Sequence, residues 1–142
     1  MPTFETRLAS VVVKNITGCT ELLEVERLSG GASQETYRLK VMLNGIATPL
    51  AMRRTPGGEY VEALPSHPGL DVEALLMQSA KAVGVPEPEV YHVLTREDDL
   101  GDGFIMEWIE GEALGARITR DPQFDSIRPT LAKACGEILA RI

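Results

Sequence analysis

The 142-residue sequence predicts an α+β fold built around an antiparallel sheet. Residues Tyr37–Leu43 alternate apolar and polar side chains with a period of two, which is typical of a strand covered on one face. Asn44 and Gly45 follow directly, and Asn-Gly between two alternating runs favours a tight hairpin, because both central positions of a type I′ turn need a positive φ. Residues 4–16 and 126–142 instead carry apolar side chains at helical spacing.

Composition and charge narrow the class of protein. The chain is 44% hydrophobic and 25% charged, as in ordinary folded proteins, and its formal charge of −7 argues against nucleic acid as the main partner. No apolar stretch is long enough to cross a membrane, and the first residues do not resemble a secretion signal. The two cysteines lie far apart without a cluster of metal-ligating residues, so we expect a cytoplasmic protein with free thiols and no metal site.

The elements before residue 70 follow from local patterns. The helix over residues 4–16 should end at Gly18, and three strands follow at 21–28, 37–43 and 46–54. The first two strands are separated by a loop of small and polar residues, and the last two by the hairpin, so the sequence predicts a three-stranded antiparallel meander. Residues 55–69 hold three prolines and three glycines and are expected to form an exposed loop.

The next element is a helix that we expect to begin near Asp71, acting as N-cap, and to end at Gly84. Its predicted sheet-facing residues are Val72, Leu75, Leu76 and Ser79. Strands are then expected over 90–94 and 104–109, separated by a polar turn, and a short helix over 114–118.

The last predicted helix, residues 126–142, carries an apolar stripe that runs to the final residue, and no Gly, Pro or polar cap terminates it at that end. This pattern favours a chain cut within a larger fold. The stripe would then have lost its cover, so we expect self-association through its exposed apolar residues: Ile127, Leu131, Ile138 and Ile142.

Four segments in order, SGGASQETYRL, LAMRR, DVEALLMQSAKAVGVPEPEV and GFIMEWIEGEAL, resemble the amino-terminal half of the aminoglycoside phosphotransferase and choline-kinase-like family. The nearest branch is the kinase-like domain fused to some acyl-CoA dehydrogenases. The resemblance covers about residues 23–142 and implies a protein-kinase-like N-lobe with a five-stranded antiparallel sheet and one packed helix.

The resemblance also implies a domain organisation. Residues 1–20 form an N-terminal helix, and residues 21–110 form the N-lobe, with a hinge near 106–111. Residues 112–142 are then the first helices of an incomplete C-lobe.

The loop between the first two strands is a candidate phosphate-binding turn. Its small residues allow backbone N–H groups to approach phosphate oxygens, and the candidates are Gly30, Gly31 and Ser33. A plain hairpin turn would show the same composition.

The third strand carries the candidate cation. If Leu50 and Met52 face the core, the period of two places Ala51 and Arg53 together on the opposite face. The resemblance implies that Ala51 lies over adenine and that Arg53, where the family more often has lysine, points to the α- and β-phosphates. The alternative is an ordinary surface cation. Arg54 should point the other way, as a solvated strand end.

Glu73 and the hinge complete the candidate site. The resemblance implies that Glu73, 20 residues after Arg53, pairs with it, although an acid in the first turn of a helix is also favoured by the helix dipole. It further implies that Met106 lies behind the adenine, whose edge bonds the Glu107 carbonyl and the Ile109 amide. A buried edge strand would look alike.

Together these residues predict the nucleotide-binding part of an ATP-dependent phosphotransferase that uses Mg²⁺ and a small-molecule hydroxyl acceptor. Neither His67 nor His92 begins the catalytic-loop motif of the family, so we assign no catalytic or metal-binding residue and expect the chain alone to be inactive. The family contains kinases of aminoglycosides, choline, homoserine and sugars, and no residue here selects among them. The alternatives are a non-catalytic kinase-like binding or regulatory module and an unrelated complete α+β domain.

Overall fold

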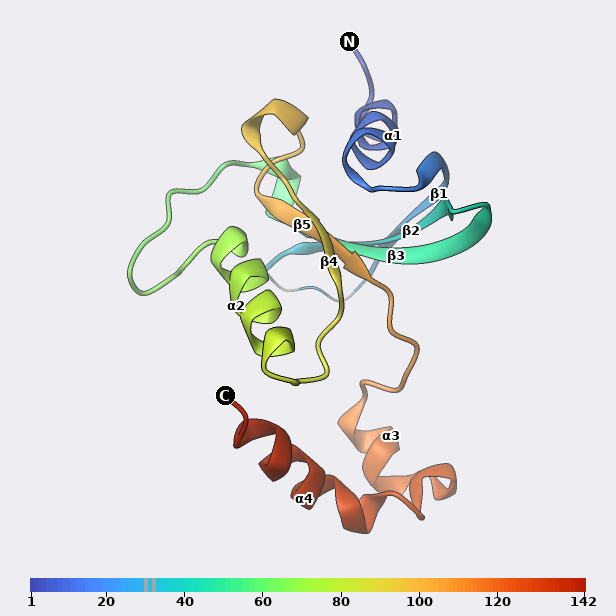
Figure 1. Ribbon diagram of the computed structural model, residues 1–142, viewed down its shortest axis with the longest axis vertical. Coiled ribbons are helices and arrows are strands. Elements are labelled where there is room, and N and C mark those ends of the chain that lie inside the picture. The colour runs from blue at the N-terminus through green and yellow to red at the C-terminus, as the bar shows by residue number, and fades with distance from the viewer. Residues whose placement is uncertain (30, 32) are drawn as a thin grey trace.

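The computed structural model describes residues 1–29, 31 and 33–142, so Gly30 of the predicted phosphate loop lies outside the described residues. The five strands form one antiparallel sheet in the order β1-β2-β3-β5-β4 (Figure 1). The predicted α+β class is therefore confirmed. The helices and strands are α1 (Phe4–Asn15), β1 (Cys19–Leu28), β2 (Glu35–Leu43), β3 (Ile46–Arg54), α2 (Leu70–Ala82), β4 (Val90–Val93), β5 (Gly103–Glu107), α3 (Gly115–Arg120) and α4 (Arg128–Leu139).

The β2–β3 hairpin sets the register of the sheet. Asn44 and Gly45 have φ values of 50° and 79°, as a two-residue type I′ turn requires. The ladder then runs without a bulge from the Leu43–Ile46 pair to the Glu35–Arg54 pair. This register fixes which residues of β3 lie opposite which residues of β2 at the far end of the hairpin, where the candidate site lies.

One face of the sheet packs against α1, which Figure 1 shows above the strands. The N-terminus of α1 is capped by Thr3, whose hydroxyl accepts a hydrogen bond from the Thr6 amide at 3.2 Å. We call the face of the sheet that packs against α1 the packed face. The residues at its centre are fully buried: Leu8 and Val12 of α1, Leu39 and Val41 of β2, Leu50 and Met52 of β3, and Ile105 of β5.

The other face carries α2, which covers only its β4–β5 end (Figure 1). We call it the open face, because its β1–β2 side chains, including Glu24, Glu26, Arg38 and Lys40, are exposed. The α2 residues that contact the sheet are Leu70 and Ala74, which pack with Val90 and Phe104.

Two predictions for α2 are wrong. The helix begins at Leu70 after Gly69, so Asp71 lies in its first turn and is not the N-cap. The predicted sheet-facing side is also wrong, since Leu75 and Leu76 are 59% and 61% exposed. The helix presents the small Ala74 to the sheet instead, and a small side chain lets helix and strand backbones approach closely. The larger apolar residues on the neighbouring side of the helix, Leu75 and Leu76, remain exposed to solvent.

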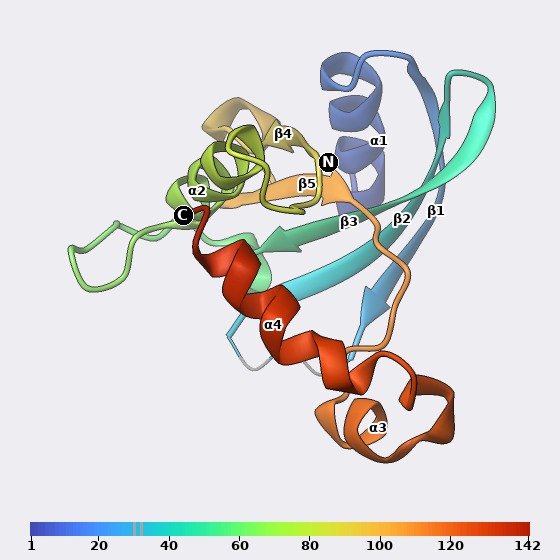
Figure 2. The same cartoon turned by 60° about the horizontal axis from the view of Figure 1, so that its bottom comes forward.

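Beyond β5 the chain leaves the sheet and forms α3 and α4, and neither helix has a buried residue. Figure 2 shows α4 running back toward α2, where the Arg141 guanidinium donates to the Gly84 carbonyl at 2.8 Å. Ile127 and Ile142 of the predicted stripe are 44% and 80% exposed, and self-association through it stays a prediction. Among the described residues, no helix combines the length and apolar character that a membrane crossing requires.

Candidate functional site

Strand β3 presents its residues as the alternating pattern predicts. Leu50 and Met52 are fully buried on the packed face. Ala51 is 6% exposed and Arg53 is half-buried, and both belong to the open face. The structure thus places the predicted small residue and the predicted cation next to each other on one side of the sheet.

Arg53 connects three elements. One of its terminal nitrogens, Nη1, donates to the carboxylate of Glu73 on α2, and the other, Nη2, donates to the side-chain oxygen of Gln34 in the loop before β2. The guanidinium also lies 5.9 Å from the centre of the Phe104 ring. Since the Arg53 and Glu73 side chains are 32% and 38% exposed, this is a partly solvated pair in reach of a ligand.

Gln34 was missed in the sequence, because a neutral amide in a loop fits no charge or metal pattern. The available signal was its position, since it closes the glycine-containing loop immediately before β2.

The described part of that loop approaches its own backbone closely. A Cβ on Gly31 would lie 2.4 Å from the carbonyl oxygen of Gln34, so only glycine fits there. Ser33 is exposed, and with Gln34 and Glu73 it lines a hollow of about 270 Å³ behind the loop. Two of the predicted loop residues therefore lie at the Arg53 end of the open face.

The segment after β5 carries the predicted hinge. Met106 lies opposite Ala51 in the β3–β5 ladder, so the two residues share one row of the sheet. The Glu107 amide donates to the Glu89 carbonyl at 2.7 Å, and the Glu107 carboxylate accepts from the Glu89 amide at 3.1 Å. Ile109 is 61% exposed. These contacts fix where the strand ends and the exposed segment begins.

A cluster that sequence reasoning did not identify joins β2 to this segment. The Arg38 guanidinium lies 5.0 Å from the centre of the Trp108 ring and 3.8 Å from the Glu110 carboxylate. The Trp108 indole N–H donates to the same carboxylate at 2.8 Å. Arg38 pairs with Ala51 across β2–β3, so this cluster lies along the row that holds Ala51 and Met106.

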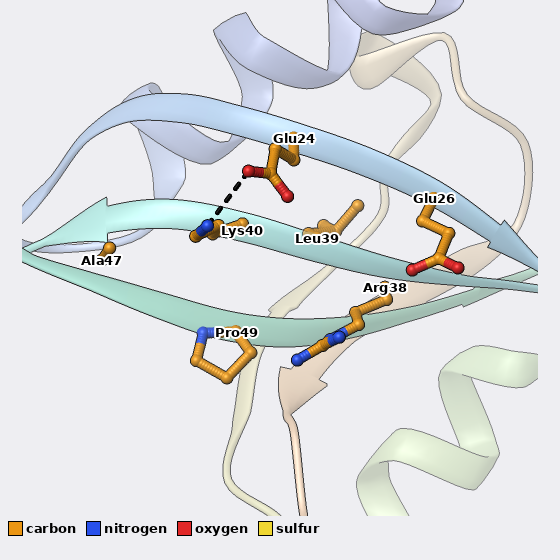
Figure 3. A pocket seen from close by; sticks show the side chains of 7 residues that line it. All are labelled: Glu24, Glu26, Arg38, Leu39, Lys40, Ala47 and Pro49. Carbon is orange, nitrogen blue, oxygen red and sulfur yellow. Dashed lines mark hydrogen bonds and ion pairs between the residues drawn. The ribbon is translucent and has the colours of Figure 1, made fainter.

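Farther along the open face is a shallow hollow of about 130 Å³ (Figure 3). The Lys40 ammonium lies 3.0 Å from the Glu24 carboxylate on the neighbouring strand. Figure 3 marks this ion pair with a dashed line. Glu26 and Arg38 also line the hollow, which contains none of the predicted site residues. Because both signs of charge are present and the Glu24–Lys40 pair is exposed, an ordinary surface ion pair accounts for this arrangement.

Arg54 contradicts the prediction of a solvated strand end, since its side chain is only 12% exposed. Its Nε donates to Glu35 at 2.8 Å, its Nη1 donates to the Leu100 carbonyl at 3.1 Å, and its guanidinium lies 4.3 Å from the centre of the Phe4 ring. The reason is the sheet register, which places Glu35 directly opposite Arg54, beneath α1.

The Glu35 carboxylate is almost fully buried at the edge of the packed face. Burial acts to raise its pKa, but hydrogen bonds from the Tyr37 hydroxyl, the Gly57 amide and Arg54 outweigh burial, so the pKa lies below its usual value. Glu35 is therefore held as a charged, fully bonded group.

His92 also has a partner within the chain. Its Nε2 lies 2.8 Å from the Asp98 carboxylate, which accepts a further hydrogen bond from the Thr95 amide at 2.8 Å. Burial acts to raise the pKa of Asp98, but these bonds outweigh it and lower the pKa. Within residues 1–29, 31 and 33–142, no three His, Cys, Asp or Glu side chains lie together as metal ligands.

A five-stranded antiparallel sheet with one helix across its open face, joined to the third strand by an Arg–Glu pair, defines a kinase-like N-lobe. The profile of the phosphotransferase enzyme family matches residues 24–142, and the chain belongs to this family. No curated protein matches the chain. The acyl-CoA-dehydrogenase-associated branch stays a prediction.

Proposed function

We propose that this chain is the nucleotide-binding part of an ATP-dependent phosphotransferase that acts on a hydroxyl group of a small molecule. The observation that carries the proposal is the contact between Arg53 and Glu73. Arg53 has five N–H donors, and the Glu73 carboxylate fixes the direction of the guanidinium without occupying all of them. A fixed cation with free donors is what binding of the α- and β-phosphates requires.

The other predicted residues are proposed to bind the base and the phosphates of a nucleotide whose α- and β-phosphates lie at Arg53. Ala51 is proposed to lie over the base because its side chain is small, and Met106, which pairs with Ala51 across β3–β5, is proposed to lie behind the base. The amide of Ile109, an exposed residue after β5, and the Glu107 carbonyl are proposed to bond the edge of the base. Gly31 and Ser33, with Gly30, are proposed to approach the phosphates through their backbone amides.

When bound, ATP supplies the γ-phosphoryl group, and Mg²⁺ neutralises the charge that develops during transfer. The residues of this chain bind and orient the nucleotide, and we assign to them neither a catalytic base nor a magnesium ligand. We therefore expect the chain alone to show no Mg²⁺-dependent turnover of ATP. Measurable turnover by the pure chain would contradict this assignment.

Nucleotide binding can be measured directly, because Trp108 is the single tryptophan and lies at the proposed base end of the site. We expect titration with Mg·ATP to change its fluorescence and to release heat in calorimetry. Arg53→Ala should weaken binding by at least about tenfold, the effect of losing a charge-assisted hydrogen bond of about 1.5–3 kcal/mol. Lys40→Ala, which removes a cation from the same face, should change affinity less than about twofold.

The alternative, a kinase-like module that binds a partner without nucleotide, predicts the opposite result. In that case neither fluorescence nor calorimetry detects Mg·ATP, and Arg53→Ala leaves partner binding intact. Unfolding curves of each variant separate lost binding from lost structure.

A further inference from the structure

We infer that Gln34 is a further nucleotide-binding residue, whose side-chain amide is oriented by Arg53 so that its N–H₂ group faces the phosphates. The inference rests on the proposed function of the open face. It assigns to the loop before β2 a side-chain phosphate ligand in addition to the backbone amides.

The first step is the geometry of Arg53. Its two terminal nitrogens have different partners, with Nη1 on Glu73 of α2 and Nη2 on the Gln34 oxygen of the loop. A guanidinium can bond two elements at once, because its N–H donors point in different directions within one rigid plane. A lysine ammonium concentrates its donors on one nitrogen at the end of a flexible stem. Arg53 therefore joins the loop to α2 in a way that lysine at this position cannot reproduce.

The second step is the orientation of the Gln34 amide. Because Arg53 can only donate, the side-chain atom that faces it must be the oxygen, which leaves the nitrogen with its two donors on the other branch. Among the described residues, that nitrogen has no hydrogen-bond partner. The amide thus presents two donors beside a cation, and a neutral amide binds an anionic oxygen without repelling it.

The third step is the rigidity of the support. The Gln34 carbonyl oxygen lies 2.4 Å from the position that a Cβ on Gly31 would take, and the next residue, Glu35, is fixed by Arg54 and Tyr37. The Gln34 backbone is therefore closely approached by Gly31 and followed by a firmly bonded residue. Its side chain is half-buried and lines the hollow that Glu73 also lines.

The inference also explains a departure from the family pattern. Lysine is the usual residue at the Arg53 position of the resembled family, whereas simultaneous contact with Gln34 and Glu73, on two different elements, uses both terminal nitrogens of the arginine. Arg53 and Gln34 then act as one unit, and their replacements should not be additive.

A double-mutant cycle with two readouts tests this unit. Gln34→Ala should weaken Mg·ATP binding about tenfold in the wild-type background, as expected for one hydrogen bond to a charged group, and less than about twofold in the Arg53→Lys background. Gln78→Ala, the same truncation at an exposed position of α2, should leave affinity unchanged. Without nucleotide, hydrogen exchange at the amides of residues 34 and 35 should be faster in both Gln34→Ala and Arg53→Lys.

The outcomes separate the inference from the proposed function. Wild-type binding that is unchanged or tightened by Gln34→Ala overturns the inference and leaves the proposed function standing. Equal losses in the two backgrounds overturn the coupling between Gln34 and Arg53. A wild-type chain that does not bind Mg·ATP overturns the proposed function and the phosphate role together, while the exchange rates still decide whether Arg53 holds the loop.

Discussion

The two faces of the sheet treat neighbouring polar residues in opposite ways. Glu35 and Arg54 face each other beneath α1 and have partners for nearly all of their polar atoms. Arg53, the residue before Arg54, instead contacts Glu73 and Gln34, and within the described residues the Gln34 amide nitrogen has no hydrogen-bond partner. The difference shows how one strand end serves two purposes. Polar groups that the chain satisfies fully hold the fold, and those that it satisfies partly are available to a ligand.

The packed face should therefore contribute most of the free energy of unfolding. The largest effect is expected from a substitution at its centre. Leu39 is fully buried between α1 and the sheet. We expect Leu39→Ala to lower the free energy of unfolding by about 2–5 kcal/mol, the usual cost of truncating a buried leucine. Urea unfolding measures the change.

The matched control is Ile46→Ala, because Ile46 is 69% exposed at the hairpin. Its effect should stay within about 0.5 kcal/mol, as for surface substitutions. Equal effects of the two substitutions would show that the core does not lie under α1.

The next largest effect is expected at the buried ion pair. Arg54→Met removes the main partner of Glu35 and leaves that carboxylate buried, so we expect a loss of about 3 kcal/mol in unfolding free energy. Arg27→Met removes a second, 64% exposed partner of the same carboxylate and should cost less than about 1 kcal/mol. A larger loss for Arg27→Met than for Arg54→Met would contradict the claim that the buried Glu35–Arg54 pair stabilises the packed face.

The smallest expected effect is the response of stability to acid. The pKa of Glu35 is lowered by folding, so its stabilising contribution is complete above its unfolded pKa of about 4.3 and is lost as the pH falls through the lower folded pKa. Asp98 acts in the same direction. Thermal unfolding between pH 7 and pH 3 should show the loss, and Glu35→Gln should make the curve shallower. An unchanged slope in Glu35→Gln would contradict the assignment.

The features that the sequence predicted correctly are those that depend on near neighbours. The Asn44-Gly45 turn and the alternation of Leu50, Ala51, Met52 and Arg53 follow from backbone geometry, so strand order within the hairpin and the direction of Arg53 could be predicted. Glu73 was identified through the family resemblance, and the contact with Arg53 agrees with it.

The features that were missed depend on contacts between residues that are far apart in the sequence. Arg54 looked like a solvated end because the sequence does not show that Glu35 lies across from it. The side of α2 that faces the sheet is set by the fit of Ala74 against Phe104, which apolar spacing alone does not reveal. Gln34 and the Arg38–Trp108 contact likewise join residues from separate strands and loops.

The most direct test of the difference between the faces compares Arg53→Ala with Arg54→Ala in two measurements on the same samples, urea unfolding and Mg·ATP titration. We predict that Arg53→Ala abolishes most nucleotide affinity and changes stability by less than about 1 kcal/mol, as for a partly exposed ion pair. Arg54→Ala should lower stability by several times more and, in the fraction that stays folded, bind Mg·ATP as the wild type does. If Arg53→Ala unfolds the chain, the proposed difference between the two faces is wrong, and if it binds nucleotide normally, the open face is not the nucleotide site.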